Sequence, residues 1–133
     1  MHKSFLQTGA VLAALSVALG AFAAHGLKKI AQEHTLTIFE TGVRYQFYHV
    51  IALILTGILY AQYPNKKMYL AGILFLAGIF LFSGSLYALT FLQVKNMEGF
   101  TAIGAITPLG GLCFMAGWLM LALGLHTKGK TGR

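Results

Sequence analysis

The residues of this chain that could do chemistry gather in one stretch, residues 38–51 (IFETGVRYQFYHVI). This stretch places Glu40, Arg44, Gln46 and His49 at the edge of an apolar run that continues to Tyr60. Ionisable groups near lipid are costly, so they normally face protein or water and have a specific partner. On an ideal helix Glu40 and Arg44 lie one turn and about 40° apart, so the two side chains can form an ion pair.

Two hypotheses account for these side chains. The first is a polar pocket at the outer end of a helix bundle, made by His25, Glu40, Arg44, Tyr45 and His49. The second is structural: Glu40 and Arg44 neutralise each other, and the histidines satisfy hydrogen bonds at the membrane interface. The sequence favours the structural hypothesis, because the groups lie near the edge of the apolar run.

The sequence predicts no metal site and no cofactor. It contains one cysteine, Cys113, and no His-x-x-x-His pair, so the spacings typical of zinc sites are missing. His25 and His49 could be the axial ligands of a haem, but two histidines without a further signal make this a weak alternative.

The sequence also predicts no enzymatic activity. Ser83, Ser85, Tyr87 and Thr90 give the third apolar run a polar edge, and no base is spaced to activate a serine. Hydrogen bonds between helices are the expected use of these hydroxyls. All three Glu lie outside the uninterrupted apolar runs, which counts against proton-coupled transport.

The composition is that of a membrane protein. Of 133 residues, 57% are hydrophobic and only 10% are charged, whereas a soluble domain carries about 25% charged residues. The length fits a single domain, residues 1–133. A net charge of +7 would suggest nucleic acid in a soluble chain, but here the basic residues lie in short connections and tails. We therefore expect a lipid bilayer, and no nucleic acid, as the partner.

Four long apolar runs predict an all-α, four-transmembrane-helix bundle, because a helix needs about 20 apolar residues to cross the hydrocarbon core. The predicted spans are residues 4–25, 43–63, 68–92 and 102–126. A short interfacial helix between the first two spans is an open alternative. The first run also has the outline of a signal peptide, but its stripe of small residues favours a retained helix.

Small residues predict where the helices approach one another. Gly9 and Gly20 belong to the stripe on the first span, and Gly110 and Gly117 belong to a groove on the fourth. Pro108 either begins the fourth helix or lies inside a longer helix that starts near residue 102.

These small-residue faces favour a packing or accessory protein that forms a homo-oligomer or joins a larger membrane complex. The alternative function is a small-molecule or lipid binder that uses the outer polar pocket. Lys and Arg counts give the orientation: the N-terminus, second connection and tail hold six of these residues, and the other two connections hold four. Both termini are therefore expected in the cytoplasm.

Four segments carry a family resemblance. They are residues 20–29 (GAFAAHGLKK), 38–53 (IFETGVRYQFYHVIAL), 82–89 (FSGSLYAL) and 104–123 (GAITPLGGLCFMAGWLMLAL). Together they resemble the DUF423 family of small bacterial membrane proteins, which is related to the transmembrane protein 256 family of eukaryotes. Family members commonly have GAFGAHG where this chain has GAFAAHG. The resemblance implies a four-helix integral protein of the bacterial cytoplasmic membrane, and it implies no function, because the family is uncharacterised.

Overall fold

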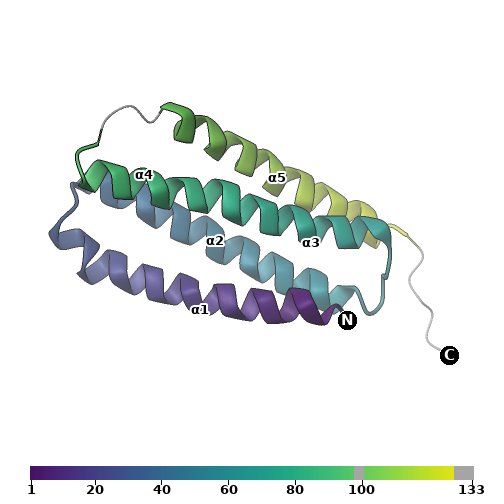
Figure 1. Ribbon diagram of the computed structural model, residues 1–133. Coiled ribbons are helices and arrows are strands. Elements are labelled where there is room, and N and C mark those ends of the chain that lie inside the picture. The colour runs from purple at the N-terminus through teal and green to yellow at the C-terminus, as the bar shows by residue number, and fades with distance from the viewer. Residues whose placement is uncertain (98–100, 128–133) are drawn as a thin grey trace.

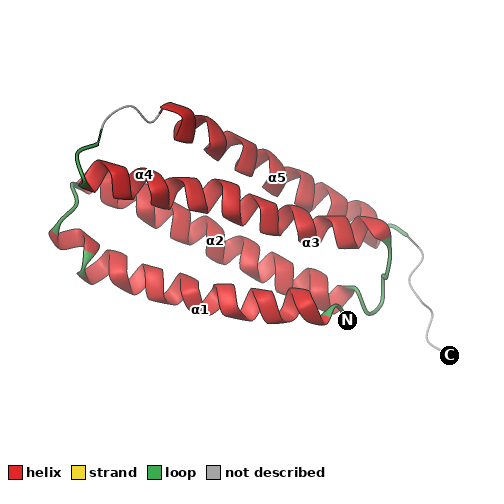
Figure 2. Ribbon diagram, in the orientation of Figure 1, coloured by secondary structure: helices red, strands yellow, loops and turns green. Residues whose placement is uncertain are grey.

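The computed structural model describes residues 1–97 and 101–127, and nearly all of this part of the chain is helical (Figure 2). The long helices lie side by side as a bundle (Figure 1). Their bounds are α1 Lys3–His25, η1 Leu27–Lys29, α2 Glu33–Leu59, α3 Lys66–Gly78, η2 Ile79–Ser83, α4 Gly84–Val94 and α5 Thr101–Leu125. η1 is a 3₁₀ turn, and η2 is a π-helical turn inside the continuous helix Lys66–Val94. Four helices of the described ranges are long and apolar enough to span a membrane, which confirms the predicted all-α membrane bundle.

The second helix differs most from its predicted span of residues 43–63. α2 begins at Glu33, ten residues earlier, and ends at Leu59. The prediction bounded the span by the absence of charge, but charged side chains do not prevent a helical backbone, and an acidic residue in the first turn stabilises it. The segment before α2 is therefore no separate interfacial helix. It holds only the three-residue turn η1 and the short link that follows (Figure 1).

Asn65 connects the turn between α2 and α3 to the end of α5 by hydrogen bonds. Its Oδ1 accepts hydrogen bonds from the backbone N–H groups of Lys67 and Met68, both at 3.1 Å, and so caps α3. Its Nδ2 donates to the carbonyl oxygen of Gly124 at 3.0 Å. The start of α1, this turn and the end of α5 consequently share one end of the bundle (Figure 1).

α1 packs mainly on α2, and two of the predicted packing glycines lie along this contact. A Cβ atom at Gly9 would stand 2.6 Å from Cγ1 of Ile54, closer than two non-bonded carbon atoms can approach. A Cβ atom at Gly20 would stand 3.7 Å from Cγ1 of Val43, which is ordinary van der Waals contact. The contact is therefore tight at Gly9 and looser at Gly20.

α5 packs mainly on α3 and also on η2, and the other two packing glycines lie at these contacts. A Cβ atom at Gly110 would overlap the backbone of Phe82 in η2, and one at Gly117 would stand 2.8 Å from the ring of Phe75. Pro108 lies inside α5, so the longer of the two predicted helices is the one that forms. Both glycines let α5 approach the continuous helix closely, as small residues do in membranes.

Candidate functional site

The structure does not bring the five residues of the predicted polar pocket together. His25 is exposed at the end of α1, and Glu40 and Arg44 are exposed on α2. No ion pair joins these last two side chains, both of which the structure describes. His49 lies 16 residues beyond Glu33, the first residue of α2, which at about 1.5 Å per residue is roughly 24 Å along the helix axis.

His49 and Tyr45 do lie together, but in the middle of the bundle rather than at its outer end. His49 is only 6% exposed. Its Nδ1 is 2.7 Å from the carbonyl oxygen of Tyr45, and its ring stacks on Phe114 of α5 with 3.5 Å between centroids and 7° between planes. His25 and His49 consequently cannot hold one haem between them within a single chain.

A buried amide, which the sequence-based prediction left out of the pocket, joins three helices instead. Gln46 of α2 is 2% exposed. Its Nε2 donates to the carbonyl oxygen of Leu12 in α1 at 3.2 Å, and its Oε1 accepts from the hydroxyl of Tyr87 in α4 at 2.7 Å. Beside it, Oγ of Ser83 donates to the carbonyl oxygen of Gly42 at 2.6 Å.

The predicted interhelical use of the hydroxyl groups is thus confirmed for Ser83, for Tyr87 and for Ser85, whose Oγ lies 2.6 Å from Oγ1 of Thr107 in α5. Thr90 differs, because its Oγ1 donates to the carbonyl oxygen of Leu86 one turn back in its own helix at 2.9 Å. Every buried side-chain nitrogen or oxygen atom of the described residues has a hydrogen-bond partner. The buried side chains of Gln46 and Ser83, together with the hydroxyl of Tyr87, therefore link separate helices by hydrogen bonds.

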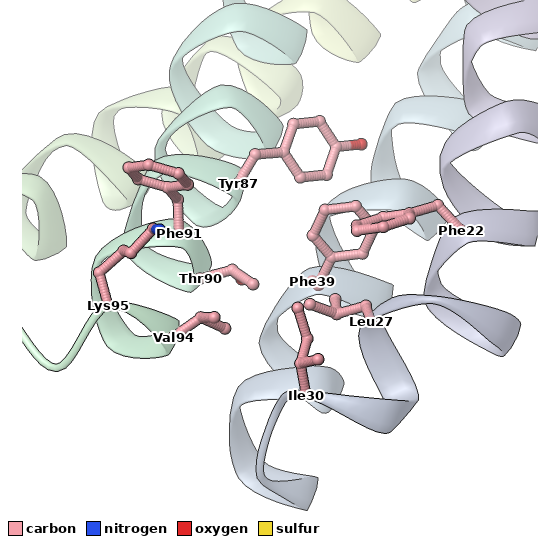
Figure 3. A pocket seen from close by; sticks show the side chains of 9 residues that line it. All are labelled: Phe22, Leu27, Ile30, Phe39, Tyr87, Thr90, Phe91, Val94 and Lys95. Carbon is pink, nitrogen blue, oxygen red and sulfur yellow. The ribbon is translucent and has the colours of Figure 1, made fainter.

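A cavity of about 430 Å³ opens at the end of the bundle where η1 lies. Its walls come from α1, η1, α2 and α4, and they are almost entirely apolar (Figure 3). The lining residues are Phe22, Leu27, Ile30, Phe39, Tyr87, Thr90, Phe91, Val94 and Lys95. Rings of three helices meet here, with centroids 5.9 Å apart for Phe22 and Phe39 and 5.0 Å apart for Phe39 and Tyr87.

Lys95 supplies the cationic group of this cavity. It is the C-cap residue of α4, and a cation is stabilised near a helix C-terminus. Its Nζ lies 5.9 Å from the centre of the Phe91 ring, so the methylene chain runs beside the cavity wall and the ammonium group stands at the edge (Figure 3).

A second, polar hollow of about 450 Å³ adjoins this cavity and shares Ile30 and Val94 with it. Its other lining residues are Gln32, His34, Thr35, Gln93, Asn96 and Met97. Oγ1 of Thr35 donates to Oε1 of Gln93 at 2.9 Å, which links α2 to α4. An apolar cavity with a lysine at its edge and a polar hollow beside it can hold the two parts of an amphiphile. We name the two hollows together the η1 site.

Comparison with known proteins identifies the family. The family described as "Protein of unknown function (DUF423)" matches residues 19–111. A UPF0382 membrane protein of Staphylococcus aureus is 40% identical over 121 residues, which cover 91% of this chain and 93% of that protein. Another from Haemophilus influenzae is 44% identical over 124 residues, covering 93% and 94%.

The UPF0382 membrane protein YwdK of Bacillus subtilis is 41% identical over 122 residues, covering 91% of this chain and 94% of that protein. No solved structure matches the chain. The printed names of these relatives state that they are membrane proteins and give no activity. Since the family match covers more than half of the sequence and the relatives match nearly all of it, this multi-pass membrane protein belongs to the DUF423 family.

Proposed function

We propose that this chain is a non-enzymatic membrane protein that binds an amphiphile with an anionic head group in the η1 site. The observation that carries the proposal is the apolar cavity with Lys95 at its edge and a polar hollow beside it. The hydroxyls of Tyr87 and Thr90 are already hydrogen-bonded, so the apolar cavity offers hydrocarbon contact everywhere except at Lys95 on its edge. A fatty acyl chain satisfies that environment.

The charge near the η1 site favours an anionic head group. Lys95 lies at the cavity edge. Lys28 and Lys29 form the last turn of the neighbouring η1. Basic residues beside a membrane attract anionic lipids, each contributing about 1 kcal/mol near the surface.

The absence of catalysis is part of the proposal. The hydroxyl of Ser83 donates to the carbonyl oxygen of Gly42, and that of Ser85 lies 2.8 Å from the carbonyl oxygen of Phe82 and 2.6 Å from Oγ1 of Thr107. These serines are thus engaged in helix packing rather than paired with a base, as a nucleophile would be.

The orientation completes the proposal. The charge bias of the connections supports an orientation with both termini in the cytoplasm of a bacterium and the protein in its cytoplasmic membrane. η1 lies at the end of the bundle opposite to the start of α1 (Figure 1). The η1 site would then take its ligand from the outer leaflet.

Native mass spectrometry of the protein extracted in mild detergent tests the proposal. Phosphatidylglycerol and phosphatidylcholine with the same acyl chains are added in turn. We expect the protein to retain phosphatidylglycerol at least about fivefold better, since each lysine near an anionic lipid contributes about 1 kcal/mol. Lys95→Gln should lower this preference about fivefold, whereas Lys67→Gln at the other end should leave it unchanged. Equal retention of both lipids by the wild-type protein contradicts the proposal.

Self-association is the second candidate function. Four alanines, Ala10, Ala14, Ala18 and Ala21, are exposed on α1 at helical spacing, on a face that α2 does not cover. Small residues let helices of two copies, or of a larger membrane complex, approach closely. The same mass spectra test it: a dimer that Ala14→Phe converts to a monomer supports this candidate, and a wild-type protein that is monomeric in every mild detergent contradicts it.

A further inference from the structure

A second apolar groove, of about 550 Å³, lies between α2 and α5. Tyr45 and His49 of α2 line it together with Phe114, Met115 and Trp118 of α5. The groove is at the depth of His49, in the middle of the bundle, and is therefore remote from the η1 site. Aromatic rings form part of its walls: the ring of His49 stacks on Phe114 and stands edge-on to Trp118, with 6.1 Å between the centroids of His49 and Trp118.

One nitrogen atom of His49, a residue that lines this groove, has no hydrogen-bond partner among the described residues. A carbonyl oxygen can only accept a hydrogen bond, so Nδ1 of His49 carries the hydrogen that it shares with the carbonyl oxygen of Tyr45. In the neutral ring Nε2 is then an acceptor. Nε2 takes part in no hydrogen bond of the described residues. Every buried side-chain nitrogen atom of these residues does have a partner. Nε2 is therefore not buried, and the small exposed part of His49 includes this atom.

An acceptor at this depth needs a donor that lipid tails do not supply. A polar group in an apolar environment without a hydrogen bond is destabilised by about 1–3 kcal/mol on protein scales. Lipid head groups lie near the ends of the helices, whereas Nε2 lies near the middle. A small-molecule ligand that supplies the donor must therefore dissolve in the hydrocarbon core.

We propose that this groove binds a membrane-soluble hydroquinone, whose hydroxyl group donates a hydrogen bond to Nε2 of His49. The aromatic rings of Tyr45, Phe114 and Trp118 provide flat apolar surfaces for its ring, and offset or edge-on contacts between aromatic rings are favourable. The proposal concerns binding alone and includes no electron transfer. It is independent of the η1 site, so either proposal can fail without the other.

Trp118 provides the measurement, because it is the only tryptophan of the chain and lines the groove. The protein is placed in phosphatidylcholine nanodiscs under argon, and its fluorescence is followed as durohydroquinone is added. The control is the dimethyl ether of durohydroquinone, which has the same ring and no hydrogen to donate. We expect saturable quenching by the hydroquinone and about tenfold weaker binding of the ether, since one hydrogen bond is typically worth that factor.

Two variants locate the hydrogen bond. His49→Phe keeps an aromatic ring against Phe114 and removes Nε2, so it should weaken hydroquinone binding about tenfold and leave ether binding unchanged. His25→Phe, at the exposed end of α1, should bind both compounds as the wild-type protein does. Equal affinity of the wild-type protein for the two compounds overturns the proposal, and so does undiminished hydroquinone binding by His49→Phe. The comparison of the two compounds on the wild-type protein decides the matter even if His49→Phe does not fold.

Discussion

Tyr87 of α4 donates its phenolic hydrogen to Oε1 of Gln46 in α2 across 2.7 Å. The two residues are 41 positions apart in the sequence. Because the same amide donates to the carbonyl oxygen of Leu12, one buried side chain links α1, α2 and α4. In a bilayer, where hydrophobic burial does not drive helices together, such hydrogen bonds and close packing hold the bundle.

Tyr87→Phe should lower the free energy of unfolding in detergent by about 1 kcal/mol, because Oε1 of Gln46 loses its donor. Combined with Gln46→Leu in a double-mutant cycle, it should show a coupling of about 0.6 kcal/mol, the average for hydrogen bonds inside membranes. Tyr48→Phe is the control, since Tyr48 is 55% exposed, and it should change stability by less than about 0.5 kcal/mol. Additive effects of the first two substitutions would show that the hydrogen bond does not couple the helices.

Gly110→Ala should destabilise the bundle by about 1–3 kcal/mol, because its Cβ would overlap the backbone of Phe82, which cannot rotate aside. Gly104→Ala in the same helix is the matched control. A Cβ there meets no atom within 4 Å, so the substitution should be neutral or stabilise the helix by up to about 1 kcal/mol. Melting temperatures in one detergent compare the two, and equal values would mean that α5 does not approach η2 closely.

Asn65 has two separable roles, as the cap of α3 and as the link to α5. Asn65→Ala removes both and should cost about 2 kcal/mol of stability, at the high end for the loss of a cap. Asn65→Asp keeps the acceptor that caps α3 and removes the Nδ2 donor to Gly124. Chemical denaturation should give Asn65→Asp a free energy of unfolding between those of the wild-type protein and Asn65→Ala. If Asn65→Asp is as unstable as Asn65→Ala, capping contributes nothing.

Glu40 and Arg44 should act independently, although their spacing suggested an ion pair. Both side chains are exposed on α2, and no ion pair joins them. The single substitutions Glu40→Ala and Arg44→Ala should therefore add within about 0.3–0.5 kcal/mol in the double variant, as independent sites do. A larger coupling, measured by thermal unfolding in lipid nanodiscs, would mean that the bilayer brings the two charges together.

Fusions after Arg133 test the orientation. Alkaline phosphatase is active only outside the cytoplasm, so we expect it to be inactive when it is fused after Arg133. Green fluorescent protein fused at the same position should be fluorescent. Replacing Lys66 and Lys67 with Glu in the same fusions should raise the phosphatase activity and lower the fluorescence, because positively charged connections stay in the cytoplasm. An active phosphatase on the unaltered chain would invert the proposed topology and move the η1 site to the inner leaflet.

The sequence by itself determined the class of the protein and the number of its spans. Uncharged runs of about 20 residues can cross a bilayer only as helices, because lipid cannot satisfy free backbone groups. The residues flanking these runs also predicted three helices to within about two residues of their ends, the usual uncertainty of such boundaries. The small residues Gly9, Gly110 and Gly117 were identified on the same local grounds, since close packing in lipid requires them.

Only the tertiary structure decided which polar groups meet. The predicted pocket placed His49 at the outer end because α2 was expected to begin at residue 43. The helix in fact begins at Glu33, and the ten additional residues place His49 about 15 Å deeper, beside Phe114 rather than His25. The contact of Gln46 with Tyr87, the π-helical turn η2 and the η1 site likewise depend on how separate helices pack. The spacing of residues within one apolar run fixes a face of one helix, and it does not specify which other helix covers that face.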